Sequence, residues 1–239
     1  MKNARRSHVY LTIAVLCFGL TAPLAASTFQ TIFDNSQNDL KDQFDPGTIQ
    51  VGDEIILAGT ARFLTTFSFE YWAVSDPSHP TTFAGNVQAR VEFYENDGPA
   101  FNGYSTPGTS FYDSGWFSVP APTSRNTFVF TAGSDFPVGG LFMPVATNMT
   151  WTVQFQGLGA GDRAGVDLYS PPIVGGDYTD YWQNDPTKGW ELMTNTIPGV
   201  PVDFAALMQA TVPEPSTVAL SICGGLGLLL AARRFRRRD

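Results

Sequence analysis

Thiols and imidazoles are scarce in this chain. Its two cysteines, Cys17 and Cys223, lie in apolar runs near the two ends, and His79 is the one histidine between residues 27 and 212. The central segment therefore offers no thiol nucleophile, no disulfide and no zinc site built on several histidines. His79 stands in Asp76-Pro77-Ser78-His79-Pro80, which is typical of an exposed loop, so a Ser-His-Asp triad is disfavoured.

Basic residues are also few in the central segment. Between residues 27 and 212 there are six lysines and arginines against 20 acidic residues, a net charge of −14, compared with −8 for the whole chain. Such an acidic surface repels nucleic acid and anionic lipid, and it favours solubility and cation binding. We expect no nucleic-acid partner.

The N-terminus has the layout of a secretory signal peptide. Met1–Arg6 carries three positive charges, Val9–Leu20 is an apolar run, and small residues follow up to Ser27. This order predicts a signal peptide over residues 1–26, helical in its apolar part and cleaved after Ala26 or Ser27. The sequence turns polar at Gln30, which argues against the alternative of a buried N-terminal helix.

The C-terminus carries a motif, an apolar run and a basic cluster in close succession. Pro213-Glu214-Pro215 precedes the uncharged run Val218–Ala232, whose 15 residues would span only about 22 Å as a helix, against a hydrocarbon core of roughly 30 Å. Five arginines follow: Arg233, Arg234, Arg236, Arg237 and Arg238. Snorkelling arginines can shorten the required span, and the positive-inside rule keeps them cytoplasmic, so we expect a short transmembrane helix with the preceding chain exported.

This C-terminal arrangement resembles the PEP-CTERM sorting signal over about residues 212–239. The resemblance implies a Gram-negative producer whose membrane protease, an exosortase, recognises Pro213-Glu214-Pro215 and cuts near it. It also implies transient anchoring in the inner membrane, then release to the cell surface or the extracellular matrix. A single-span anchor that is never cut is the alternative.

The segment between the ends has a hydrophobic period of two. Phe63, Thr65, Phe67, Phe69 and Tyr71 share one parity. The same alternation recurs in Asn86–Tyr94 and Thr150–Gln156, as half-buried antiparallel strands require. Shorter candidate strands are Glu54–Ala58, Phe111–Val119, Thr127–Thr131, Gly165–Tyr169 and Trp190–Met193.

These strands and their Gly/Pro-rich loops predict an all-β domain over residues 27–197. We expect an antiparallel β-sandwich, jelly-roll-like, with a closed barrel as the alternative. Residues 198–212 are expected to form a linker, in which Val202–Ala210 could form one short helix, and residues 213–239 form the sorting tail.

The central segment also resembles the β-rich domain of "choice-of-anchor" bacterial surface proteins, in which one domain type occurs with different sorting tails. The resemblance rests on Val51–Thr60 running into Phe67–Tyr71, with Arg90–Tyr94 and Tyr169–Pro172 as further matches. It implies an extracellular β-rich fold for most of residues 30–195 and no particular activity.

Two groups of acidic residues are candidates for structural calcium, because Ca²⁺ takes six to eight oxygen ligands from carboxylates, amides and main-chain carbonyls. The first group is Asp34, Asp39, Asp42 and Asp45; the second is Asp177, Asp180 and Asp185. Ordinary loop capping by Asp and Asn is the alternative.

Four aromatic residues form a candidate carbohydrate-binding face: Tyr178, Tyr181, Trp182 and Trp190. Their rings could pack on sugar C–H groups, or they could cover the open end of a core. The favoured hypothesis is a non-enzymatic surface or matrix protein associated with exopolysaccharide or biofilm; a carbohydrate-binding module and a polysaccharide-active enzyme are the alternatives. No motif selects a catalytic carboxylate pair among the 20 acids.

Overall fold

The computed structural model describes residues 28–78, 80–194 and 200–212, which lie within one unit, Thr28–Val212. The predicted signal peptide, His79, the Pro-Glu-Pro motif, the apolar tail and the arginine cluster fall outside the described residues. Every regular element of the described residues is a β-strand, so the all-β prediction is confirmed. No helix capable of crossing a membrane is found among them.

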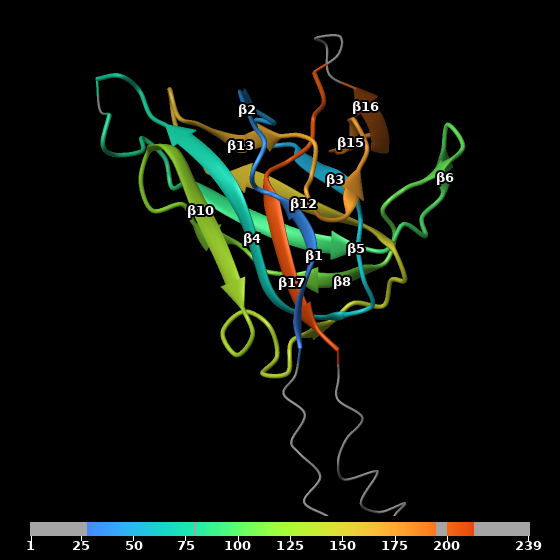
Figure 1. Ribbon diagram of the computed structural model, residues 1–239. Helices are drawn as coiled ribbons and strands as arrows, with labels where there is room; N and C mark the ends of the chain where they lie inside the picture. Colours follow the sequence, from blue (N-terminus) through green and yellow to red (C-terminus); the bar gives the residue numbers. More distant parts are fainter. Residues whose placement is uncertain (1–27, 79, 195–199, 213–239) are drawn as a thin grey trace, which may run out of the picture. The chain divides into compact units, whose positions relative to one another are not determined.

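Two antiparallel sheets make up the fold (Figure 1). Sheet A contains β1 (Phe29–Asn35), β17 (Ala206–Thr211), β4 (Phe63–Val74), β13 (Arg163–Tyr169) and β2 (Asp39–Phe44), with β10 (Thr123–Thr131) and β11 (Leu141–Phe142) also paired to β4. Sheet B runs β16 (Gly189–Thr194), β15 (Asp180–Asp185), β3 (Gln50–Ile56), β12 (Asn148–Gln156), β5 (Gln88–Tyr94) and β8 (Ser110–Asp113), with β14 (Gly176–Asp177) and β9 (Phe117–Ser118) attached. A small hairpin of β6 (Ala100–Phe101) and β7 (Tyr104–Ser105) extends from sheet B.

The two sheets share one aromatic core. Phe67 and Phe69 of β4 contact Trp151 of β12, with ring centroids 5.3 and 5.7 Å apart. Trp151 also meets Phe204 at 5.7 Å, and all four side chains are fully buried. The period-two alternation produces this arrangement, because every second side chain of β4 and β12 points to the same interior.

The segment expected to be a linker with a short helix is a strand, so that prediction is wrong. β17 pairs with β1 on one side and with β4 on the other. Ala206, Met208 and Ala210 are buried on one parity, which is a strand pattern that several small residues had obscured. The β-domain therefore extends to Val212 rather than ending at residue 197.

Strand ends differ from the sequence prediction where glycine interrupts the pattern. β3 begins at Gln50 rather than Glu54 and includes Gly52. A Cβ at Gly52 would lie 2.7 and 2.8 Å from the methyl groups of Thr150 and Thr152, so only glycine fits between these threonines. Phe111–Val119 is divided into β8 and β9 around Gly115, whose φ is +64°.

Candidate functional site

A polar cleft of about 500 Å³ opens on sheet B where β3, β5 and β12 meet the β6–β7 hairpin. Glu54 of β3, the residues that follow β5, the start of β12 and the 144–147 loop line it. Tyr104, at the tip of the hairpin, also lines the cleft and is 59% exposed. The cleft therefore combines carboxylates, carboxamides and one exposed aromatic ring.

Glu54 is held from two sides. Trp182 Nε1 donates to its Oε2 at 3.4 Å, and Asn148 Nδ2 donates to its Oε1 at 3.5 Å. Burial raises the pKa of Glu54, and these two donors oppose the rise only in part. Both bonds are long, so the carboxylate keeps capacity to accept from a ligand.

The turn after β5 positions the amide and carboxylate side of the cleft. Thr150 Oγ1 donates to Asn96 Oδ1 at 2.8 Å, and the buried Asn96 Nδ2 forms no hydrogen bond of ordinary geometry but is close enough to Glu54 to oppose the rise in its pKa. Asp97 accepts from the main-chain N–H of Thr109 at 2.6 Å and from its hydroxyl at 2.7 Å, and these bonds lower the pKa of Asp97. Asn96 thus places an amide donor beside Glu54, while Asp97 holds the turn in place.

The β6–β7 hairpin brings Tyr104 to the cleft. Asn102 and Gly103 at its turn have φ values of +52° and +92°, the left-handed geometry that an Asn-Gly hairpin turn requires. Phe101 meets the Trp182 ring edge-on at 6.4 Å, which fixes the hairpin to sheet B. Tyr104 was not among the predicted site residues, although the Asn-Gly pair is a sequence signal for this hairpin.

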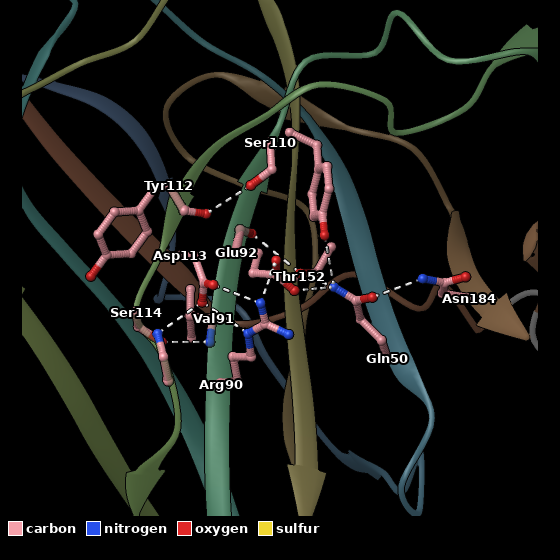
Figure 2. A network of polar contacts seen from close by, with 12 residues as sticks. Gln50, Arg90, Val91, Glu92, Ser110, Tyr112, Asp113, Ser114, Thr152 and Asn184 are labelled. Atoms are coloured by element: carbon pink, nitrogen blue, oxygen red, sulfur yellow. Dashed lines mark hydrogen bonds and ion pairs between the residues drawn. The ribbon is translucent and has the colours of Figure 1, made fainter. Parts of the chain in front are cut away.

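Beside the cleft, a network of polar side chains crosses the face of sheet B that is turned away from the core (Figure 2). Gln50 Nε2 donates to Glu92 Oε2 and to Thr152 Oγ1, both at 2.9 Å, and its Oε1 accepts from Asn184 at 2.9 Å. The network joins β3, β5, β12 and β15, so it stabilises the sheet on which the cleft is built.

Arg90 extends this network toward the sheet edge. Its guanidinium donates to both Asp113 carboxylate oxygens, at 2.8 and 2.6 Å, and lies 3.1 Å from Glu92 (Figure 2). The Arg90 bonds lower the pKa of Asp113, whereas burial raises the pKa of Glu92 despite the nearby charge.

Two aromatic rings meet over the same face. β5 and β16 are separated by three strands, so a flat sheet would hold them about 19 Å apart. Tyr94 of β5 and Trp190 of β16 nevertheless lie with ring centroids 5.7 Å apart. Because Gln50 also donates to the Tyr94 hydroxyl at 3.3 Å, the two rings cover the polar network and the face is concave.

The four predicted sugar-binding aromatics are dispersed. Tyr181 is buried in the core against Phe44, and Trp182 is fully buried on the opposite face of β15. Trp190 is half-buried against Tyr94, and Tyr178 is exposed in the loop before β15. Core packing, the alternative, therefore describes Tyr181, whereas Trp182 is buried on the cleft side of sheet B against Phe101 of the hairpin.

The first predicted calcium group is spread along β1, β2 and the following turn, each acid with its own surroundings. Asp34 accepts from the Ser36 main-chain N–H and hydroxyl. Asp39 accepts from Lys41 and Arg125, and Asp45 accepts from Arg163 and the Gly47 N–H. Asp42 is exposed on β2.

The second predicted calcium group is divided. Asp185 caps the β15–β16 turn by accepting from Thr187 and the Lys188 N–H. Asp177 and Asp180, in contrast, lie near two buried aspartates that the sequence analysis did not select, Asp53 and Asp203. Burial and the neighbouring carboxylates raise the pKa of Asp177 to about 7; burial, with Asp180 nearby, raises that of Asp203 to about 6. Burial raises the pKa of Asp53 well above its ordinary value.

Residues 28–78, 80–194 and 200–212 contain no ready-made group of three histidine, cysteine, aspartate or glutamate side chains at metal-site spacing. Comparisons with protein-family models, with curated proteins and with solved structures find no match for the chain.

Proposed function

We propose that this chain is a non-enzymatic exported protein of the cell surface or extracellular matrix, and that its β-domain binds matrix polysaccharide in the cleft beside Glu54. The cleft is the observation that carries the binding part of the proposal. Its carboxylate, carboxamides and exposed tyrosine are the groups that bind sugar hydroxyls and C–H faces.

The sorting part of the proposal rests on the two ends of the sequence. A basic-then-apolar start and a Pro213-Glu214-Pro215 motif before an apolar run and five arginines favour export followed by exosortase processing. Cell fractionation and intact mass, with and without the sorting protease, test it. A product that lacks residues 1–26 and the arginine tail is expected outside the cell. A full-length tail kept in the inner membrane would instead support the uncut anchor.

A jelly-roll arrangement is our proposal for the finer fold. Strands β2, β3, β4 and β5 alternate between sheets A and B, as do β10, β12, β13 and β15. Repeated crossing between two antiparallel sheets is characteristic of jelly rolls, and such sandwiches commonly present a binding face on one sheet.

Binding of the full chain to the exopolysaccharide of its own host tests the cleft. Tyr104→Ala removes the exposed ring, and we expect a roughly 2- to 10-fold loss of affinity, since aromatic contacts contribute about 0.5–1.5 kcal/mol. Tyr178→Ala is the matched control, because Tyr178 is also exposed but lies in another loop. If Tyr104→Ala binds as well as wild type while Tyr178→Ala loses affinity, the binding site would lie in the loop of Tyr178 instead of the cleft.

A polysaccharide-active enzyme is the second candidate, favoured by one feature. Glu54 faces the cleft and burial raises its pKa, as a general acid requires. Turnover of the host polysaccharide that disappears in Glu54→Gln would establish this alternative. Binding without turnover is the result that we expect.

A further inference from the structure

Three aspartates from separate segments of the chain lie close enough to raise one another's pKa. Asp53 lies on β3, on the same inward parity as Val51 and Ile55 of the core. Asp177 belongs to β14, which pairs with β3, and Asp203 precedes β17. Asp53 has no exposed surface and Asp203 is 1% exposed, while Asp177 is half-buried. We refer to these residues as the aspartate trio.

The trio has too few hydrogen-bond donors for its oxygens. Asp53 Oδ2 accepts from the Phe204 N–H at 2.9 Å, but its Oδ1 has no partner. The buried Oδ2 of Asp177 and both oxygens of Asp203 also lack a hydrogen bond of ordinary geometry, although the nearby Ser170 side chain partly opposes the rise in the Asp203 pKa. Buried carboxylates are normally paired, because an unsatisfied buried acceptor costs about 1–3 kcal/mol, and more when it is charged.

No basic residue of the described segments serves the trio. Five of the six form ion pairs with other acids: Lys41 and Arg125 with Asp39, Arg90 with Asp113, Arg163 with Asp45, and Lys188 with Glu191. The sixth, Arg62, donates to main-chain carbonyl oxygens, including those of Ala61 and Val145. The trio can therefore stay neutral only by holding protons, and once its members ionise, their negative charge has no cation of the described segments beside it and would need a counterion from solution.

We propose that the aspartate trio binds a divalent cation, calcium, between β3, β14 and the segment before β17. The donors are all carboxylate oxygens, which suit a hard cation and not a soft one. Since no three side chains converge ready-made, carboxylates acting in pairs would hold the ion, with water and main-chain carbonyl oxygens completing the coordination of six to eight oxygens. Asp177, which is half-buried, provides the route from solvent.

This site differs from both calcium groups predicted from the sequence. Asp53 and Asp203 belong to neither group, and Asp185 is engaged at the β15–β16 turn. An ion here would tie sheet B to the chain that leads into the central strand β17, so it would stabilise the fold. The inference is independent of glycan binding and of export.

Thermal unfolding of the purified full chain in detergent tests the proposal by comparing Tm in roughly 2 mM CaCl₂ with Tm in EDTA. Millimolar calcium suits the weaker, extracellular class of calcium sites. At a concentration about 100 times Kd, we expect calcium to raise Tm by roughly 5–10 °C. Asp203→Asn and Asp177→Asn should lose this rise. The control Asp42→Asn should keep it, because Asp42 is an exposed acid of the rival group.

Terbium provides a second readout that does not depend on variant stability. Tyr181 is buried in the core one residue before Trp182, which pairs with Gly52, the neighbour of Asp53, so Tb³⁺ in the trio should give luminescence sensitised by this ring, and millimolar Ca²⁺ should displace it. No calcium-dependent rise in wild-type Tm, or an equal rise in all four proteins, would overturn the proposal. Terbium luminescence unchanged in Asp203→Asn would also contradict it.

Discussion

The acids along β2 and the aspartate trio carry the same functional group in opposite surroundings. Asp39 accepts from Lys41 and Arg125 at 2.6 and 2.8 Å, and Asp45 accepts from Arg163 at 2.7 Å. The Arg125 guanidinium holds the pKa of Asp39 well below its ordinary range, whereas burial raises that of each trio member. Two acids of the dense stretch are thus paired with cations, whereas no ion pair reaches the trio among the described residues. Density of acids along a sequence is therefore a poor guide to unbalanced charge.

The largest expected effect is a fall in stability with rising pH in calcium-free buffer. The folded-state pKa values of Asp177 and Asp203, about 7 and 6, lie above the ordinary 3.8. Their contribution is complete below 3.8 and is lost as the pH rises through 6 and 7. Allowing for the partial exposure of Asp177, the free energy of unfolding should be about 3 kcal/mol lower at pH 8 than at pH 4, measured by urea titration. Equal stability at both pH values would show that ionisation of the trio does not destabilise the folded protein.

Removing the charge of Arg125, which contacts several of the paired acids, should destabilise the protein. Arg125 lies within ion-pair distance of Asp39, Glu70 and Asp167, and its guanidinium lies 5.5 Å from the centre of the Tyr169 ring. We expect Arg125→Gln to lower the free energy of unfolding by about 2 kcal/mol at pH 7, with Arg125 partly exposed. Because Arg125 holds the pKa of Asp39 well below its ordinary 3.8, this loss should begin to diminish as the pH falls below 3.8 and should disappear only well below that value, where Asp39 itself protonates. A loss of the same size at pH 7 and at roughly pH 2 would indicate packing rather than charge.

Removing an ionisable carboxyl group from the trio should raise the free energy of unfolding, whereas removing Arg125 should lower it. Asp53→Asn keeps an oxygen that can accept from the Phe204 N–H but cannot ionise. We expect the variant to be about 1 kcal/mol more stable than wild type at pH 8 in EDTA, and nearly unchanged at pH 4. Destabilisation at both pH values would mean that Asp53 is well satisfied as a carboxylic acid.

An exposed ion pair should matter least. Lys41 is 80% exposed at its side chain and pairs with Asp39 at 2.6 Å. Lys41→Gln should change stability by less than about 0.5 kcal/mol in either direction. A larger change in the free energy of unfolding, measured by chemical denaturation, would show that exposed ion pairs, rather than Arg125, contribute most to stabilising the acids of β2.

The sheet architecture was predictable where alternation is strong. Phe63–Tyr71 and Thr150–Gln156 fall within β4 and β12, because their apolar residues occupy one parity with polar residues between them. β17 was not predicted. At its start, the consecutive apolar residues Ala205, Ala206 and Leu207 differ in size but not in polarity, so no alternation of apolar and polar residues is visible there. Its place in the middle of sheet A depends on pairing with β1 and β4, which no local pattern encodes.

The candidate sites were less accessible to sequence reasoning. The cleft forms from Glu54, Asn96 and Tyr104, and Glu54, which lies far from the other two in the chain, meets them only because β3, β12 and β5 are neighbours. Asp203 stands alone among apolar residues, and Asp53 is next to a single other acid, Glu54. One available signal was that Asp53 occupies an inward parity between Val51 and Ile55, where a charged residue is rare.

The most direct measurement is the titration of individual aspartate carboxyl carbons by NMR in calcium-free buffer. The contrast between the two acidic regions predicts that Asp177 and Asp203 titrate near pH 7 and 6, while Asp39 stays ionised well below its ordinary range. Titration of all three residues near pH 4 would contradict the account, because the trio would then carry its charge without cost and would need no counterion.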